Sequence, residues 1–179
     1  MSIKKIILIV AVTFLIAGLI VWLTTRVDNK NIAYIAPPNT EGLGEAGQAF
    51  ENQGQTHIKI GESHPAYNSN PPTSGWHYLV PADWGVYTKP LVDEQALHNL
   101  EHGGIWISYK GIDDQTKDNL KKIARANPSS VIVSPRESND TAIILASWTR
   151  LEKMGSYDEA KILDFISRNK NKSPEPLAK

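Results

Sequence analysis

The stretch ALHNLEHGGIWISY, residues 96–109, predicts a helix, a chain reversal and a strand in immediate succession. Asp93 stands just before it as a candidate N-cap, and an acidic first turn follows. Gly103 occupies the position at which many helices end with a residue in the left-handed conformation. In the segment 104–109 every second residue is a large apolar or aromatic side chain, as in a strand that faces a core. We therefore expect a short helix that leads directly into a core strand.

The sequence after this strand predicts a second helix and two further strands. The helix begins at Asp113 or Asp114, shows an amphipathic period and ends near Ala126, before an Asn-Pro pair. Two apolar runs follow, over residues 131–135 and 141–148, and Ser-Asn-Asp separates them. This short polar connection indicates a hairpin of two neighbouring strands.

The fold class follows from the order of these elements. Ser156 and Glu159 match a capping box, which predicts a last helix with apolar residues at positions 162, 163, 165 and 166. The whole order is then loops, helix, strand, helix, strand, strand, helix. It predicts an α+β fold: a small mixed or antiparallel sheet with two or three flanking helices on one sheet face.

The N-terminus carries an apolar run over residues 6–23 that contains no charged residue. As a helix the run would be roughly 27 Å long, close to the thickness of a bilayer core. Lys4 and Lys5 precede it, which favours an N-terminus in the cytoplasm and a C-terminal domain outside. We expect one N-terminal transmembrane helix, a signal-anchor in the cytoplasmic membrane. A cleaved signal peptide is the alternative, and it exports the same domain.

Composition divides the rest of the chain. Residues 1–25 form the predicted signal-anchor, and residues 26–54, rich in Gly, Pro and Asn, form a tether with one short helical turn near 45–50. Residues 55–170 form the extracytoplasmic α+β domain. Residues 171–179 form a polar tail.

Charge and cysteine content exclude several functions. Of the 179 residues, 19 are Lys or Arg and 19 are Asp or Glu, so the formal net charge is zero. A neutral chain without a basic stripe does not predict nucleic-acid binding. Cysteine is absent, which excludes disulfides, thiolate catalysis and iron–sulfur ligation. The membrane, through residues 6–23, is the one partner that the sequence predicts, and a protein partner stays open.

All five histidines lie between residues 57 and 102. His98 and His102 are spaced i, i+4, so on a helix one metal ion can reach both rings. His77 follows a constrained Pro-Pro-Thr-Ser-Gly loop and is the predicted third ligand. His57 and His64 are secondary candidates. Histidine without cysteine fits a divalent transition metal, of which Zn²⁺ and Cu²⁺ agree best with this set.

Glu101 has three alternative roles. It is a metal ligand, a group that orients a histidine ring, or a general base. The string His98-x-x-Glu101-His102 matches a zinc-peptidase pattern in which glutamate activates a metal-bound water, so a metal-dependent hydrolase is one alternative function. The other is a metal-free structural or partner-binding module, in which the polar cluster braces loops by hydrogen bonds.

The loop region 55–92 is rich in aromatic residues, which indicates an ordered structure around a site. Tyr67 and Tyr87 are the residues expected to border the pocket. No nucleophile–base pair and no phosphate-binding loop accompanies these positions.

Two motifs, NSNPPTSGWHY (68–78) and ALHNLEHGGIWISY (96–109), resemble a bacterial family catalogued as domain of unknown function 3105. Gly85-Val-Tyr87, Ser147-Trp148 and Pro174-Glu175 also match, so the resemblance covers residues 54–176. It implies a domain that follows a single membrane helix. It also implies a site at Tyr67, His77, His98, Glu101 and His102, and it leaves the reaction open.

Overall fold

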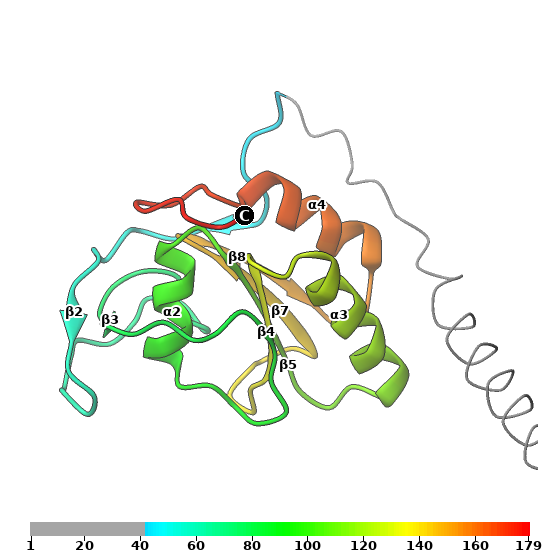
Figure 1. The fold of residues 1–179 in the computed structure, drawn as a ribbon, viewed down its shortest axis with the longest axis horizontal. Helices are drawn as coiled ribbons and strands as arrows, with labels where there is room; N and C mark the ends of the chain where they lie inside the picture. Colours follow the sequence, from blue (N-terminus) through cyan, green and yellow to red (C-terminus); the bar gives the residue numbers. More distant parts are fainter. Residues whose placement is uncertain (1–41) are drawn as a thin grey trace, which may run out of the picture. The chain divides into compact units, whose positions relative to one another are not determined.

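The computed structural model describes residues 42–179, which form an α+β domain with a mixed six-stranded sheet, a two-stranded sheet and three helices (Figure 1). The elements in chain order are β1 (Gln48–Ala49), β2 (His57–Ile58), β3 (His77–Tyr78), β4 (Gly85–Val86), α2 (Asp93–Glu101), β5 (Ile105–Tyr109), α3 (Asp114–Ala126), β6 (Val131–Pro135), β7 (Ile143–Ser147), β8 (Arg150–Met154) and α4 (Glu159–Asn169). The α+β class predicted from the sequence is confirmed.

The strand order in the large sheet is β1-β8-β7-β5-β6-β4. The central strand β5 runs parallel to β6 and antiparallel to β7. The predicted hairpin of β6 and β7 is therefore wrong, because β5 lies between them. The helix α3 carries the chain from β5 to a parallel β6 on one side, and this leaves the other side of β5 free for β7. The hairpin in the sheet is β7 with β8, a strand that the sequence analysis did not predict.

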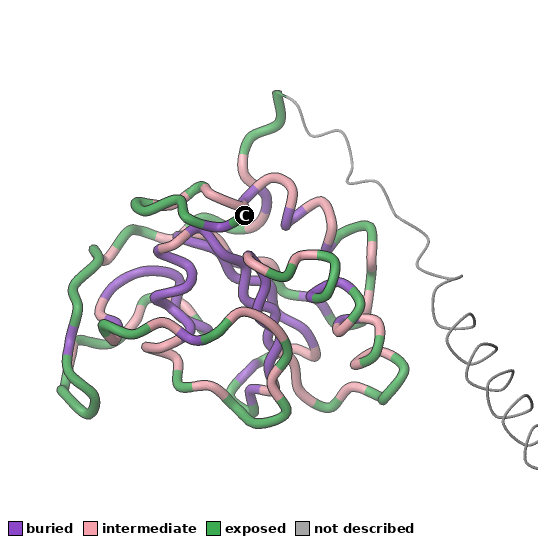
Figure 2. Tube along the Cα trace, in the orientation of Figure 1, coloured by how far each residue is buried: buried purple, intermediate pink, exposed green. Residues whose placement is uncertain are grey.

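Helices cover both faces of the sheet, not one face as expected. On one face Ile105 and Ile107 pack with apolar residues of α3 and α4. On the other face Trp106 and Ile132 pack against Ala96, Leu97 and Leu100 of α2. Because alternate residues of a strand point to opposite faces, β5 has an apolar residue for each core. The buried parts of the chain concentrate in the central strands and in α2 (Figure 2).

The helix ends confirm one predicted cap and correct two. Asp113 caps α3, and its carboxylate accepts a hydrogen bond from the Thr116 backbone N–H at 2.7 Å. Asp93 is the first helical residue of α2 and not its N-cap, which is Val92. The cap of α4 is Asp158, in place of the expected Ser156. Asp158 accepts a hydrogen bond from the Lys161 backbone N–H, whereas Val92 makes no side-chain capping bond.

Residues on both sides of the predicted domain pack against it. The short helical turn expected near 45–50 is instead the strand β1, which pairs with β8. Ala46 is buried beside it, and its backbone N–H donates to the Asn169 side chain at 2.9 Å. At the other end, Leu177 and Ala178 donate backbone hydrogen bonds to the His102 carbonyl. The segment 171–179 is therefore bound to the end of α2 and does not extend away from the domain.

Within residues 42–179, none of the helices is both long and apolar enough to cross a membrane. The apolar run at 6–23, its predicted orientation and most of the predicted tether lie outside the described residues.

Candidate metal centre

Three histidines and one glutamate from three separate parts of the chain converge beside α2. They are His57, His77, His98 and Glu101, and the ligand atoms that they offer all lie within 4.8 Å of one another. His57 and His77 are directly opposite each other in the parallel pair β2–β3. His98 and Glu101 lie one turn apart at the end of α2. The two-stranded sheet therefore presents two imidazoles to the C-terminal turn of the helix.

One oxygen of Glu101 is the common point of this group. Its Oε2 lies 3.0 Å from His77 Nε2, 3.5 Å from His57 Nε2 and 3.8 Å from His98 Nε2. The imidazole rings themselves are in contact. The ring centroid of His57 lies 4.7 Å from that of His77 and 4.9 Å from that of His98. Three Nε2 atoms thus surround one carboxylate oxygen.

Backbone carbonyl groups determine which ring nitrogen carries the proton in two of the histidines. His77 Nδ1 donates to the Gly75 carbonyl at 2.8 Å, and His98 Nδ1 donates to the Tyr78 carbonyl at 2.6 Å. A carbonyl oxygen can only accept, so in the neutral rings the Nε2 atoms hold lone pairs. The His77 lone pair faces Glu101 Oε2, which is also an acceptor, whereas His98 Nε2 lies 3.1 Å from His102 Nε2 and 3.8 Å from Glu101 Oε2. The close pair of His77 and Glu101 requires a proton or a cation between its two acceptors.

Burial makes this requirement stronger. The side chains of His77 and Glu101 are 0% exposed and that of His98 is 5% exposed, whereas His57 is 38% exposed at the rim. Burial lowers the pKa of His98 below its ordinary value, which favours the neutral ring despite the opposing hydrogen bond to Tyr78. The second carboxylate oxygen, Glu101 Oε1, is buried and has no hydrogen-bond partner among the described residues. A buried anion with an unpartnered oxygen is costly unless a cation joins it.

His102 lies next to this group and not within it. Its Nε2 is 3.1 Å from His98 Nε2 and 3.5 Å from Glu175 Oε2. Together with Glu101 and Glu175 it forms a second group whose ligand atoms lie within 4.8 Å. Glu175 was not among the predicted site residues, although Pro174-Glu175 was part of the family resemblance.

The remaining predicted residues surround the group without joining it. His64 hydrogen-bonds Glu94 at 3.2 Å and belongs to neither ligand group. The Tyr67 hydroxyl donates to the Trp76 carbonyl at 2.5 Å and in this way supports the loop before His77. Burial raises the pKa of this hydroxyl. Tyr87 donates to the Asp83 carbonyl and packs against the apolar cluster under α2.

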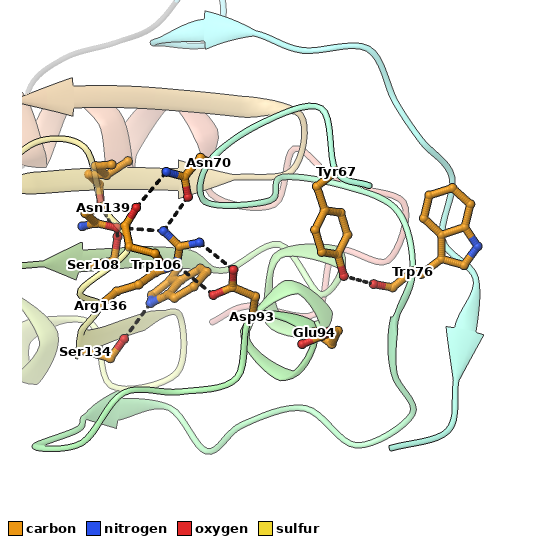
Figure 3. A network of polar contacts seen from close by, with 12 residues as sticks. Tyr67, Asn70, Trp76, Asp93, Glu94, Trp106, Ser108, Ser134, Arg136 and Asn139 are labelled. Carbon is orange, nitrogen blue, oxygen red and sulfur yellow. Dashed lines mark hydrogen bonds and ion pairs between the residues drawn. The ribbon is translucent and has the colours of Figure 1, made fainter. Parts of the chain in front are cut away.

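A polar network around Arg136 fastens the loop that bears His77 to the start of α2 (Figure 3). Arg136 donates to both carboxylate oxygens of Asp93, at 2.8 and 2.6 Å, and to the Asn70 side chain at 2.6 Å. Its guanidinium also lies over the Trp106 ring, 5.8 Å from the centroid. The fork geometry of arginine suits a bidentate pair with one carboxylate. Both segments that supply the buried side chains of the group are thereby held to the same sheet.

A further constraint acts on the strand pair. The His77 backbone N–H donates to the Thr56 carbonyl at 3.0 Å, and that of Gly75 donates to the Gly54 carbonyl at 2.7 Å. Gly75 has a φ of +114°, a conformation that side chains rarely adopt. The Pro-Pro-Thr-Ser-Gly loop therefore delivers His77 opposite His57 in a single register.

The fold and the convergent imidazoles define a small α+β domain with a buried histidine–carboxylate group that could hold a metal ion. A family model, described as Protein of unknown function (DUF3105), matches residues 57–179, and the chain belongs to that family. The matched region begins at His57 and contains both ligand groups, and it confirms the resemblance noted in the sequence. No curated protein and no solved structure matches the chain.

Proposed function

We propose that the protein is a membrane-anchored, extracytoplasmic metal-binding domain, in which His57, His77, His98 and Glu101 hold one divalent transition metal ion. The observation that supports it most is the buried His77 Nε2 lone pair at 3.0 Å from a buried carboxylate oxygen, with the Nε2 atoms of His57 and His98 at 3.5 and 3.8 Å from the same oxygen. Two acceptors in a dry place, His77 Nε2 and Glu101 Oε2, repel one another, and a cation converts that repulsion into coordinate bonds.

The spacing of the ligand atoms fits this proposal. In a tetrahedral site with bonds of about 2.1 Å, ligand atoms lie about 3.4 Å apart. The three distances from Glu101 Oε2, at 3.0, 3.5 and 3.8 Å, bracket that value. Nitrogen and oxygen ligands without sulfur favour Zn²⁺ or Cu²⁺. The carbonyl partners of His77 and His98 orient the rings in the way that supporting groups orient histidine ligands elsewhere.

This geometry supports Glu101 as a ligand more than as a general base. A base must be free to take a proton from a metal-bound water. Glu101 Oε2 instead stands among the three imidazoles, at the place that a ligand oxygen would occupy. A hydrolase would require another base, and we place the function with metal binding.

Metal content of the full-length chain, purified in detergent, tests the proposal. We expect at least one equivalent of Zn²⁺ or Cu²⁺ by elemental analysis and a rise in melting temperature when the ion is restored after chelation. His77→Gln should weaken binding by about 100-fold or more. His64→Gln removes a histidine outside both groups and serves as the matched control. Less than about 0.1 equivalent, with no shift in melting, would leave only the metal-free structural module.

Labelling of intact cells tests the predicted location. The chain has no cysteine, so one introduced cysteine is the only target of a maleimide. Ser156 is exposed, and we expect Ser156→Cys to react with a membrane-impermeant maleimide in intact cells. Ser2→Cys, on the predicted cytoplasmic side, should react only after lysis. The opposite pattern would contradict the orientation.

A further inference from the structure

We infer that a second divalent ion binds beside the first, held by His102, Glu175 and the Glu101 carboxylate, which would bridge the two ions. The inference rests on the proposed function, because the bridging carboxylate belongs to the first site. His102, Glu175 and Glu101 offer ligand atoms within 4.8 Å of one another. Imidazole and carboxylate are ligands that the same class of ion accepts.

The two oxygens of Glu101 are used unequally, and this inequality points to a bridge. Oε2 faces the three imidazoles of the first group. Oε1 is fully buried and lacks a hydrogen-bond partner among residues 42–179. An ion on the Oε2 side would therefore leave Oε1 as a ligand atom that no ion uses. Carboxylates of this kind join the two ions of two-metal sites, which lie about 3.5–4 Å apart.

The C-terminal segment places Glu175 at this position through its backbone. The N–H groups of Glu175, Leu177 and Ala178 donate to the carbonyls of Glu101 and His102, at distances of 2.9 to 3.1 Å. These carbonyls belong to the end of α2, where helical carbonyl groups lack partners within the helix. The same hydrogen bonds that complete the helix end therefore bring the Glu175 carboxylate within 3.5 Å of His102 Nε2.

The second position is the more exposed of the two. The side chains of His102 and Glu175 are 21% and 48% exposed, in contrast with the buried ligands of the first group. The Glu175 side chain is partly in solvent, and it loses rotamer freedom when its carboxylate binds an ion. We expect the second ion to bind more weakly than the first and to be lost first on dialysis.

Titration of the full-length chain with Cu²⁺ separates the two positions. The wild-type chain should bind two equivalents, and Glu175→Gln should bind one. Glu137→Gln changes another exposed glutamate, which belongs to neither group, and should still bind two. Because two Cu²⁺ ions about 4 Å apart couple magnetically, the paramagnetic resonance signal per copper should fall with the second equivalent. Glu175→Gln should keep the full signal.

Each other outcome has a distinct meaning. One equivalent in the wild-type chain would overturn the second position and leave the first intact. Two equivalents in Glu175→Gln would overturn the role of Glu175. No bound copper or zinc in any variant would overturn the proposed function itself.

Discussion

His77 and His98 show how the backbone can select a metal-binding tautomer before any metal arrives. The Nδ1–H of each ring donates a hydrogen bond to a carbonyl oxygen, of Gly75 and Tyr78 respectively. The Nε2 lone pair of His77 thereby faces Glu101 Oε2 at 3.0 Å, at the cost of repulsion between two acceptors, and that of His98 faces His102 Nε2 at 3.1 Å. The metal-free fold thus contains an unfavourable cluster that a bound cation would relieve.

Glu101→Gln should separate binding from stability. The amide keeps the shape of the side chain, removes the charge and offers N–H groups to the imidazole lone pairs. We expect metal affinity to fall by about 100-fold or more. In chelator the same variant should be more stable than wild type by about 1 kcal/mol, because a buried unsatisfied charge has been removed. Urea denaturation with and without Zn²⁺ measures both effects, and a loss of stability in chelator would contradict this account.

The metal-free protein should also lose stability in acid through His98. Burial lowers the pKa of His98 in the folded chain, so the unfolded chain binds the proton more readily. The contribution of the neutral His98 ring to the free energy of unfolding is therefore fully present above about pH 6.5. It declines as the pH falls toward the pKa of His98 in the folded chain. Urea midpoints of the chelated protein at pH 7.5 and 5.5 measure the decline. His98→Gln should show a smaller decline, and an unchanged one would assign the effect to other groups.

At the scale of single elements, the end of α2 is tightly constrained. The helix ends at Glu101, and Gly103 follows with a φ of +84°. A Cβ at Gly104 would lie 2.4 Å from the Trp84 ring and 2.9 Å from the Asn99 carbonyl. Two glycines are therefore required, one for the backbone conformation and one for the close packing.

Gly104→Ala should be destabilising because a rigid aromatic ring and a backbone carbonyl occupy the place of the new methyl group. Overpacking of this kind costs about 1–3 kcal/mol. Gly155→Ala is a matched control, because a Cβ there meets nothing within 4 Å. Denaturation midpoints of the two variants make the comparison. Equal stability of both would mean that Trp84 moves aside freely.

Local periodicity predicted some elements well. The amphipathic helix α3 and the strands β5 and β6 have a clear period and were located from the sequence. The strand β8 has the sequence RLEKM, in which only Leu151 and Met154 are buried, so no apolar alternation marked it. Pairing order is a long-range property, and for this reason the hairpin of β6 and β7 was predicted wrongly.

The same distinction between local and long-range information applies to the site. The i, i+4 spacing pointed to His98 and His102 as joint ligands. In the structure the two Nε2 atoms do lie 3.1 Å apart, and His102 Nε2 lies 3.5 Å from Glu175 on its other side. His57 ranked as secondary because its approach to His77 depends on the pairing of β2 and β3, which join distant segments. The i, i+3 pair of His98 and Glu101 was also visible in the sequence, but nothing in the sequence favoured it over the i, i+4 pair of histidines.

At the scale of the whole molecule, the described domain is closed by its own C-terminal segment. Residues 175–178 cover the end of α2, and Asn171 exchanges two hydrogen bonds with Ala178, at 2.8 and 3.0 Å. Ala178 is itself buried. The segment therefore contributes to the fold as well as to the inferred second ion position.

Deletion of residues 174–179 should lower the stability of the chelated protein. The carbonyls of Glu101 and His102 lose three backbone donors, and each net hydrogen bond contributes about 1 kcal/mol. We expect a loss of about 2–3 kcal/mol in urea denaturation. Deletion of Lys179 alone retains those donors and is the control. A truncated chain as stable as wild type would show that water replaces the donors without cost.

The convergence of β2, β3 and α2 has a mechanical consequence. His57, His77 and Glu101 belong to separate segments that otherwise meet through a two-residue strand pair and side-chain contacts. A bound ion would join them as a reversible crosslink. Tension applied across the domain would then be resisted at the coordinate bonds, and the rupture force would depend on the supply of metal around the molecule.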